Sequence, residues 1–465
     1  MVMQDSRRSS AIGTVRGPGG PAGPETPVRR TGGVVSTVLR ATAVVLVLNF
    51  DQFPRMVGRG FLIAAVVLAV PLLLHELLRP ASRSRTVIFW TLVVFGVLAL
   101  PGILHPPETD YGRQKFLLLM TLTVFATAAV AVLRGRRDVE MFAAVFVLSG
   151  VVLAIATLNG DPQDGRADGF GSNPIWLARA IGGALVALTW LYLRKRVAAW
   201  WAAGLAVLLG LGLLATGSRG PLLATVVALF VLVLAGFRLK IRRGRREWVG
   251  LGLMGGLVLA VIALPSLLPP RVYALLVDPS DEMFGTARAE MREVSVPMIA
   301  ENPGGVGYGN WGDYSGMLVH NYPHNLWLEL PAEAGWLVGG AFILATVVVA
   351  AGLWRATRRD PVAGFVLAVL AFNVVAVSTS GDVNAGRPLF AALALGGLVR
   401  AGATLPAGRR ARAGRTRRSC RCRPRPRHRL ASGSPPAAGS TGPGSRGPPG
   451  RCARRCAAAA ARDRS

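Results

Sequence analysis

The fold is decided by a pattern that is clearest over residues 79–104, where RPASRSR (79–85) precedes TVIFWTLVVFGVLALPGIL (86–104). The first segment carries three arginines, and the second carries no charged residue. An apolar run of roughly 17 to 25 residues can cross the hydrocarbon core as a helix, in which backbone groups bond to one another. The chain then becomes polar and reaches an acid at Asp110. This pattern predicts a membrane-spanning helix with one basic and one acidic flank.

The pattern recurs along all but the ends of the chain. Hydrophobic residues make up 52% of the 465 positions, and the mean hydropathy of +0.44 exceeds that of domains that must cover their surface with polar groups. We therefore predict an all-α integral membrane protein with about 12 transmembrane helices. The predicted helices are at residues 34–50, 60–78, 86–104, 116–133, 140–158, 174–193, 198–215, 221–237, 248–267, 325–353, 361–378 and 387–402. The first is the weakest, because Arg40 interrupts it.

Charge alternates between successive connections and predicts the orientation. Alternate connections are basic, with Arg79, Arg83, Arg85, Arg134, Arg136, Arg137, Arg194, Lys195, Arg196, Arg238 to Arg246, Arg355, Arg358 and Arg359. The others carry nearly all the acids, including Asp110, Asp161, Asp164, Asp168, Asp278, Asp281, Glu282 and Asp313. Because basic connections remain in the cytoplasm, we expect a multi-pass protein of the inner membrane with both termini cytoplasmic.

The same topology accounts for the net charge of +29, because the arginines are spread over connections and a tail and do not form one basic folded unit. We therefore expect no nucleic acid partner. The four cysteines all lie in the tail, and CRC and CARRC lack the paired spacing of a zinc site. We expect no metal site and no cofactor.

Three regions are predicted. Residues 1–33 form a disordered cytoplasmic N-terminus, residues 34–402 form the membrane domain, and residues 403–465 form an Arg/Pro/Gly-rich cytoplasmic tail that cannot bury a core. The tail composition also fits a shifted reading frame in a GC-rich gene.

Within the membrane domain, residues 268–323 form a large external loop between the ninth and tenth helices, and long loops in compact proteins are often functional. A short amphipathic helix is predicted near 283–303.

Three arginines on the external side are candidates for binding phosphate, which a guanidinium can grip with two parallel hydrogen bonds. Arg219 lies in a Gly-Ser-Arg-Gly turn between the seventh and eighth helices, and could instead reach lipid headgroups. Arg288 and Arg292 are four residues apart and share a helix face. That face could equally be solvated, with both arginines paired to Glu290 or Glu293.

The segment HNYPHNLWLELPAEAGWLVG (320–339) carries the candidate proton-transfer group. His324 and Asn325 stand directly before the tenth predicted helix, and histidine moves protons near neutral pH or donates to phosphate. His320 is an alternative to His324, and either could serve only as a structural hydrogen-bonding group. Glu329 and Glu333 follow at helical spacing, where they could orient His324 or act as packing partners.

These segments together resemble a known family. GSRGPLLA (217–224), AENPGGVGYGNW (300–311) and HNLWLELPAEAGWLVG (324–339) resemble, in order and spacing, the O-antigen ligase and O-antigen polymerase family of polytopic bacterial envelope proteins. GRADGFGSNPIWLAR (165–179) looks like the family's Gly-x-Phe-x-Asn-Pro segment, although Ile175 and Trp176 depart from its commoner form. The resemblance covers about residues 160–345.

The resemblance implies a membrane glycosyltransferase of cell-surface polysaccharide assembly. It would take a glycan from an undecaprenyl diphosphate carrier and join it to a lipid or glycan acceptor at the external face, inverting the anomeric carbon. By analogy, Arg219 and Arg288 hold the diphosphate and His324 assists the acceptor hydroxyl or the phosphate, which makes these three the catalytic residues. The further residues expected to contact substrate are Arg292, Asn325, Glu333 and Asn173. Arginines can replace the electrostatic role of a divalent ion, so a metal-independent reaction is expected.

Two questions stay open at the level of sequence. A ligase and a polymerase differ only in their acceptor, and the residues do not choose between them. A transporter or flippase of lipid-linked glycans could also use about 12 helices, but transporters often show related halves with charges near mid-membrane. The two halves here show no evident repeat, and the polar residues gather on one face, which favours chemistry at the surface.

Overall fold

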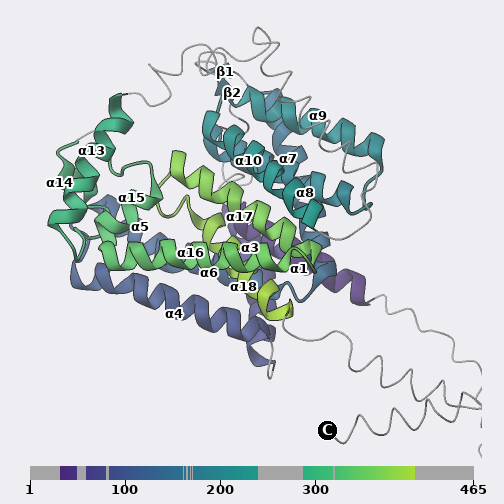
Figure 1. Cartoon of the computed structure of the whole chain (residues 1–465), viewed down its shortest axis with the longest axis horizontal. Coiled ribbons are helices and arrows are strands. Elements are labelled where there is room, and N and C mark those ends of the chain that lie inside the picture. Colours follow the sequence, from purple (N-terminus) through teal and green to yellow (C-terminus); the bar gives the residue numbers. More distant parts are fainter. Residues whose placement is uncertain are drawn as a thin grey trace, which may run out of the picture. The chain divides into compact units, whose positions relative to one another are not determined.

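The computed structural model describes residues 32–49, 59–79, 83–160, 162–163, 166–167, 169, 171–238, 286–317 and 320–403, and these are predominantly helical (Figure 1). The first half comprises α1 (Gly32–Leu48), α3 (Arg59–Leu78), α4 (Arg83–Leu104), α5 (Asp110–Leu118), the π-helix η2 (Leu119–Thr123), α6 (Val124–Ala129), the 3-10 turn η3 (Val130–Val132) and α7 (Arg136–Leu158).

The second half begins with two short antiparallel strands, β1 (Pro162–Gln163) and β2 (Arg166–Ala167). The helices that follow are α8 (Pro174–Leu193), α9 (Ala199–Ala215), α10 (Arg219–Arg238), α13 (Thr286–Glu301), α14 (Trp311–Ser315), α15 (Leu326–Ala334), α16 (Trp336–Ala356), α17 (Pro361–Thr379) and α18 (Arg387–Ala403).

The predicted class of a helical membrane protein is confirmed. Within the described ranges, eight helices are long and apolar enough to cross a membrane, and two shorter apolar helices span Gly33–Leu48 and Ala199–Ala215. The predicted helix at 248–267, most of the N-terminal segment 1–33 and nearly all of the tail 403–465 lie outside the described residues. The count of about 12 therefore stays a prediction.

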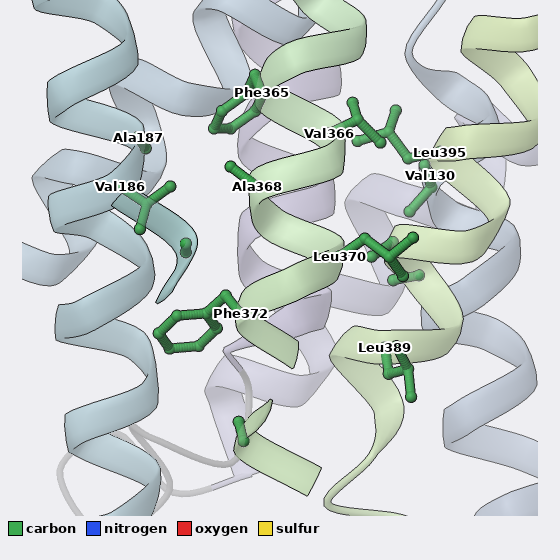
Figure 2. Close-up of a cluster of buried hydrophobic side chains, with 14 of the residues drawn as sticks. Val130, Val186, Ala187, Phe365, Val366, Ala368, Leu370, Phe372, Leu389 and Leu395 are labelled. Atoms are coloured by element: carbon green, nitrogen blue, oxygen red, sulfur yellow. The ribbon is translucent and has the colours of Figure 1, made fainter. Parts of the chain in front are cut away.

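Helix α17 is central to the packing of the spanning helices. Figure 2 shows Phe365 and Phe372 on the side of α17 that faces α8, and Leu370 on the side that faces α18. Helix α10 also packs along α17. At one end of this core the Trp190 ring stacks on Phe365 with centroids 4.5 Å apart. In contrast, Phe89 and Leu344 are more than half exposed, as lipid-facing apolar side chains are in a membrane protein.

The predicted single helix at 325–353 is wrong, because the structure divides it into α15 and α16. Gly335 separates them with a φ of +89°, a conformation that side chains other than glycine rarely adopt. The backbone also approaches closely here, since a Cβ on Gly335 would lie 2.8 Å from the carbonyl oxygen of Pro303. The break lets α15 pack against α13 and α14 while α16 runs on as a spanning helix.

The large predicted loop is partly helical. Helix α13 confirms the helix expected near 283–303, and α14 follows it. Met291 and Met298 from α13, Trp311 from α14 and Ala332 from α15 form a small buried apolar cluster. The loop segment 286–317 is therefore packed onto the start of the region that carries His324, as Figure 1 shows for α13, α14 and α15.

Replacing Gly335 with alanine should destabilise the protein by about 1–3 kcal/mol, because the new side chain requires a strained φ and meets the Pro303 carbonyl. Thermal unfolding in detergent measures the loss. Gly340→Ala is the matched control, since a Cβ on Gly340 in the adjoining helix would meet nothing within 4 Å. Equal melting of both variants would contradict the prediction.

Candidate functional site

Arg219 is the first residue of α10, directly after a tight turn. The turn needs Gly217, whose φ is +60°, and its Thr216 hydroxyl accepts from the backbone N–H of Ser218 at 3.2 Å. Arg219 is half-buried. Gly220 brings this helix end against Thr379 at the end of α17, too close for a Cβ. The guanidinium is thus carried by a rigid helix start and not by a loose loop.

Arg288 projects from the first turns of α13, and its side chain keeps contact with solvent. Partial burial lowers the pKa of Arg288, and the positive charge of Arg219 lowers it further. Two segments that are distant in the sequence therefore bring two like charges near each other. Such a pair repels in the empty protein and attracts an anion with several negative oxygens. The arrangement can hold a phosphate or diphosphate group.

Arg292 lies one turn beyond Arg288 on the exposed face of α13. Among the described residues, no ion pair joins Arg288 or Arg292 to Glu290 or Glu293. The alternative in which these arginines pair with acids on their own helix is therefore not observed. Both arginines are placed to meet an approaching anion.

His324 stands directly before the N-cap of α15 with a φ of +53°, in the left-handed region. Its ring lies 4.3 Å from the ring of Tyr322 and 5.9 Å from the ring of His320, measured between centroids. Tyr322 in turn stacks on Tyr111 from α5. The two candidate histidines therefore share one aromatic cluster. A strained backbone at such a position is typical of residues held for a function.

The electrostatic surroundings keep His324 neutral. Burial lowers its pKa to about 4, and the positive charges of Arg288 and His320 contribute to that lowering, while Asp382 raises the pKa. A neutral imidazole at neutral pH has a nitrogen that accepts a proton. His324 is thus within electrostatic reach of Arg288, in the protonation state of a general base.

Asp382 is a member of this cluster that the sequence did not indicate. It lies between α17 and α18, where its Oδ2 accepts from the Tyr111 hydroxyl at 3.4 Å and its Oδ1 accepts from the Ala385 N–H at 2.9 Å. Burial raises the pKa of Tyr322 to about 12, with a further contribution from the Asp382 charge. The polar run STSGDVNAGR (378–387) between α17 and α18 is the sequence signal that could have pointed to this acid.

Asn173 and Asn325 each begin a helix. The Asn173 side chain accepts from the Ile175 N–H at 2.9 Å and starts α8, and the Asn325 side chain accepts from the Trp327 N–H at 3.0 Å and starts α15. Both amides therefore satisfy helix N-termini. Asn325 sets the position at which the chain leaves His324 and enters α15. Contact of either amide with substrate stays a prediction.

Glu329 and Glu333 both pair with Lys115 of α5. Their carboxylates lie 2.7 Å and 2.6 Å from the Lys115 ammonium, and all three side chains are at most 1% exposed. This arrangement matches the packing role left open for the two acids, because among the described residues their hydrogen bonds go to Lys115 and Val383 and not to His324. Glu333 thus lies in a buried ion cluster, and its contact with substrate stays a prediction. Lys115 is a second residue of this region that the sequence did not indicate.

No metal centre is evident in the part of the chain that the structure describes, where no group of three or more His, Cys, Asp and Glu side chains is arranged to hold an ion. The tail cysteines considered above lie outside the described residues.

Removing the Lys115 ammonium should destabilise the protein strongly. Lys115→Met leaves two buried carboxylates without a cation, and breaking a buried pair in this way costs about 3–5 kcal/mol. The triple variant Lys115→Met, Glu329→Gln, Glu333→Gln removes the uncompensated charge and should recover much of the loss. Thermal unfolding of the two variants in detergent distinguishes these outcomes. A triple variant less stable than Lys115→Met would contradict the ion-pair explanation.

Comparison with known proteins supports the resemblance seen in the motifs. A family model described as O-antigen ligase matches residues 204–343, the stretch that contains Arg219, Arg288 and His324. A curated O-antigen ligase of Pseudomonas aeruginosa is 29% identical over 273 residues, which cover 56% of this chain and 63% of that protein. The match thus spans less than two thirds of the relative's length. The family model covers the segment that carries the arginines and His324, and over that segment this chain is similar to O-antigen ligases.

Proposed function

We propose that this chain is a membrane glycosyltransferase of cell-surface polysaccharide assembly. It transfers a glycan from an undecaprenyl diphosphate carrier to a lipid or glycan acceptor at the external face of the cytoplasmic membrane. The observation that carries the proposal is that the Arg219 charge acts on Arg288 and the Arg288 charge acts on a neutral His324, at the ends of helices of a membrane domain. The family supports glycan transfer as the class of reaction.

The chemistry follows from the charges. The acceptor oxygen attacks the anomeric carbon, the bond from that carbon to the diphosphate oxygen breaks, and the electron pair leaves with the diphosphate. Negative charge grows on the diphosphate as the bond breaks. Arg219 and Arg288, fixed in advance at a boundary of low dielectric, stabilise the transition state more than the ground state. Direct displacement inverts the anomeric carbon.

His324 receives the proton of the acceptor hydroxyl. In the empty site the Arg288 charge disfavours a second positive charge on the imidazole. A bound diphosphate neutralises that repulsion, so the affinity of His324 for a proton rises when the donor is present. Asp382 then stabilises the imidazolium that forms. The base is therefore strongest when the leaving group is in place.

The external face is supported by the distribution of charge along the spanning helices. His324 precedes α15, Arg219 begins α10 and Asp382 follows α17. Basic residues lie at the far ends of the helices, where α10 ends at Arg238, the last turn of α16 carries Arg355 and α7 begins at Arg136. Basic residues favour the cytoplasmic side, which leaves the proposed site on the side where a translocated lipid-linked glycan would be.

Purified protein with a lipid diphosphate glycan and an acceptor should transfer sugar in the presence of a chelator. Arg219→Ala and His324→Ala should each lower kcat by about 100-fold or more, since a preorganised charge or a positioned base contributes that much. Arg136→Ala is the control, because Arg136 forms an exposed pair with Glu140 one turn away on α7. Full activity of both site variants would overturn the site assignment.

The products identify the activity. A ladder of lengthening products indicates a polymerase, and a single transfer indicates a ligase. Movement of the lipid-linked glycan without transfer indicates the transporter alternative.

The pH dependence of turnover follows from the pKa of His324. Because the neutral imidazole is the active form, activity is present above its pKa and is lost as the pH falls through it. The acid limb of kcat/KM, which reports the free enzyme, should lie near pH 4. The acid limb of kcat, which reports the complex, should lie at higher pH because bound diphosphate raises that pKa. Two coincident limbs would contradict the proposed effect of the leaving group.

A further inference from the structure

Arg179 ties together the end of α17 and the beginning of α18. From the second turn of α8, its Nη2 donates to the carbonyl oxygens of Ala376 at 2.8 Å and Ser380 at 2.6 Å. Its Nη1 donates to the carbonyl oxygen of Ala385 at 2.9 Å. The last carbonyls of a helix have no partner within the helix and carry partial negative charge, so a cation is well placed there. One guanidinium thereby bridges a helix end and the following turn.

We call the segment that Arg179 bridges, residues 380–386, the site turn. Its shape depends on Gly381, whose φ is +81° and whose Cβ, if present, would lie 2.6 Å from the Cβ of Ala385. Val383 and Asn384 are buried in it. The Val383 N–H donates to Glu329 at 2.9 Å, and the Asn384 amide donates to the Lys115 carbonyl oxygen at 3.0 Å. The site turn is thus held from α5, α8 and α15 together.

Asp382 is the charged member of the site turn, and it is half-buried. Among the described residues, the charged and titratable groups that act on His324 are Arg288 from α13, His320 and Asp382, and the Tyr322 ring touches the His324 ring. Asp382 is the acid in that group. Contacts also connect Asp382 with His324, because Asp382 accepts from the Tyr111 hydroxyl, the Tyr111 ring stacks on Tyr322, and the Tyr322 ring lies 4.3 Å from the His324 ring. The distance between Asp382 and His324 therefore depends on what fixes the site turn. Arg179 donates two bonds to that turn, at Ser380 and Ala385, and a third to Ala376 at the end of α17.

We propose that Arg179 is a positioning residue, whose guanidinium fixes the site turn so that Asp382 remains close enough to His324 to stabilise the imidazolium formed during transfer. The inference rests on the proposed function and extends it to a residue outside the arginine and histidine cluster. Both Nη atoms of Arg179 are bonded to backbone carbonyls, which favours a positioning role over substrate binding.

The rival role for Arg179 is direct binding of an anion. Arg179 lines a cavity of about 100 Å³ in the core together with Asn49, Asn373 and Asn384, and its Nε is buried without a partner among the described residues. A ligand held there would change KM when Arg179 is replaced. A residue that acts through Asp382 would change kcat and its pH dependence instead. The two roles therefore separate in steady-state kinetics.

The test compares Arg179→Met and Arg179→Lys with the full-length protein in detergent or vesicles, using a lipid diphosphate glycan as donor. Arg179→Met should lower kcat about 10- to 100-fold, the scale expected when a group of the site is misplaced by about 1 Å. KM for the donor should change little. The acid limb of kcat should move to lower pH, because His324 loses the carboxylate that favours its protonated form. Arg179→Lys keeps a cation near the carbonyls, so its kcat and acid limb should lie between those of the unaltered protein and those of Arg179→Met.

A double-mutant cycle identifies the path of the effect. Asp382→Asn should lower kcat and move the acid limb in the same direction as Arg179→Met, and the double variant should be no worse than the poorer single variant. Gly381→Ala strains the site turn without removing any charge, and it should give the same shift even if Arg179→Met fails to fold. Additive losses in the cycle, or a raised KM with an unmoved acid limb, would overturn the inference.

The control is Arg40→Met. Arg40 is another buried guanidinium, and it lies 2.7 Å from Asp138 in the first turn of α7. That turn is at the opposite end of α7 from the loop leading into α8. The variant Arg40→Met should lower thermal stability and leave the acid limb of the folded enzyme in place. If the unaltered protein transfers no glycan, the proposed function fails, and if His324→Ala and Arg219→Ala remain active, the proposed site fails. If those two variants are inactive while Arg179→Met keeps its kcat and acid limb, only the positioning role fails.

Discussion

The buried ion cluster of Lys115, Glu329 and Glu333 is the interaction on which the rest of the site depends. A charge withdrawn from water in a membrane domain is tolerated only where a partner compensates it. Lys115 brings two carboxylates of α15 against α5, and Glu329 also receives the Val383 N–H of the site turn. One cation therefore joins the helix that follows His324, the helix that carries Tyr111 and the turn that carries Asp382.

This scaffold resolves a conflict between the two tasks of the proposed site. Cations must gather to hold a diphosphate, yet their charge suppresses the protonation that a general base undergoes. Arg288 and burial lower the pKa of His324, and Asp382 acts in the opposite sense. The balance depends on distances between groups carried by separate helices. Arg179 and Glu329 hold the site turn, which carries Asp382. The site turn therefore controls how far Asp382 raises the pKa of His324.

Several parts of this arrangement were predictable from local sequence. Apolar runs and basic connections predicted the helical membrane fold, and α13 follows the amphipathic pattern near 283–303. Short motifs drew attention to Arg219, Arg288 and His324 because phosphate chemistry needs those side chains. The helix predicted at 325–353 was wrong because Gly335 stops it through a close contact with Pro303, and hydropathy does not register a contact 32 residues away.

The sequence by itself determined that this chain crosses a membrane and that it resembles a particular family of envelope proteins, since burial in lipid requires apolar length and the motifs are contiguous. Only the tertiary structure decided which polar residues meet. Lys115 finds Glu333 across 218 positions, and Tyr111 finds Asp382 across 271. Those pairings depend on how helices pack, and packing is set by many weak apolar contacts that no short stretch of sequence contains.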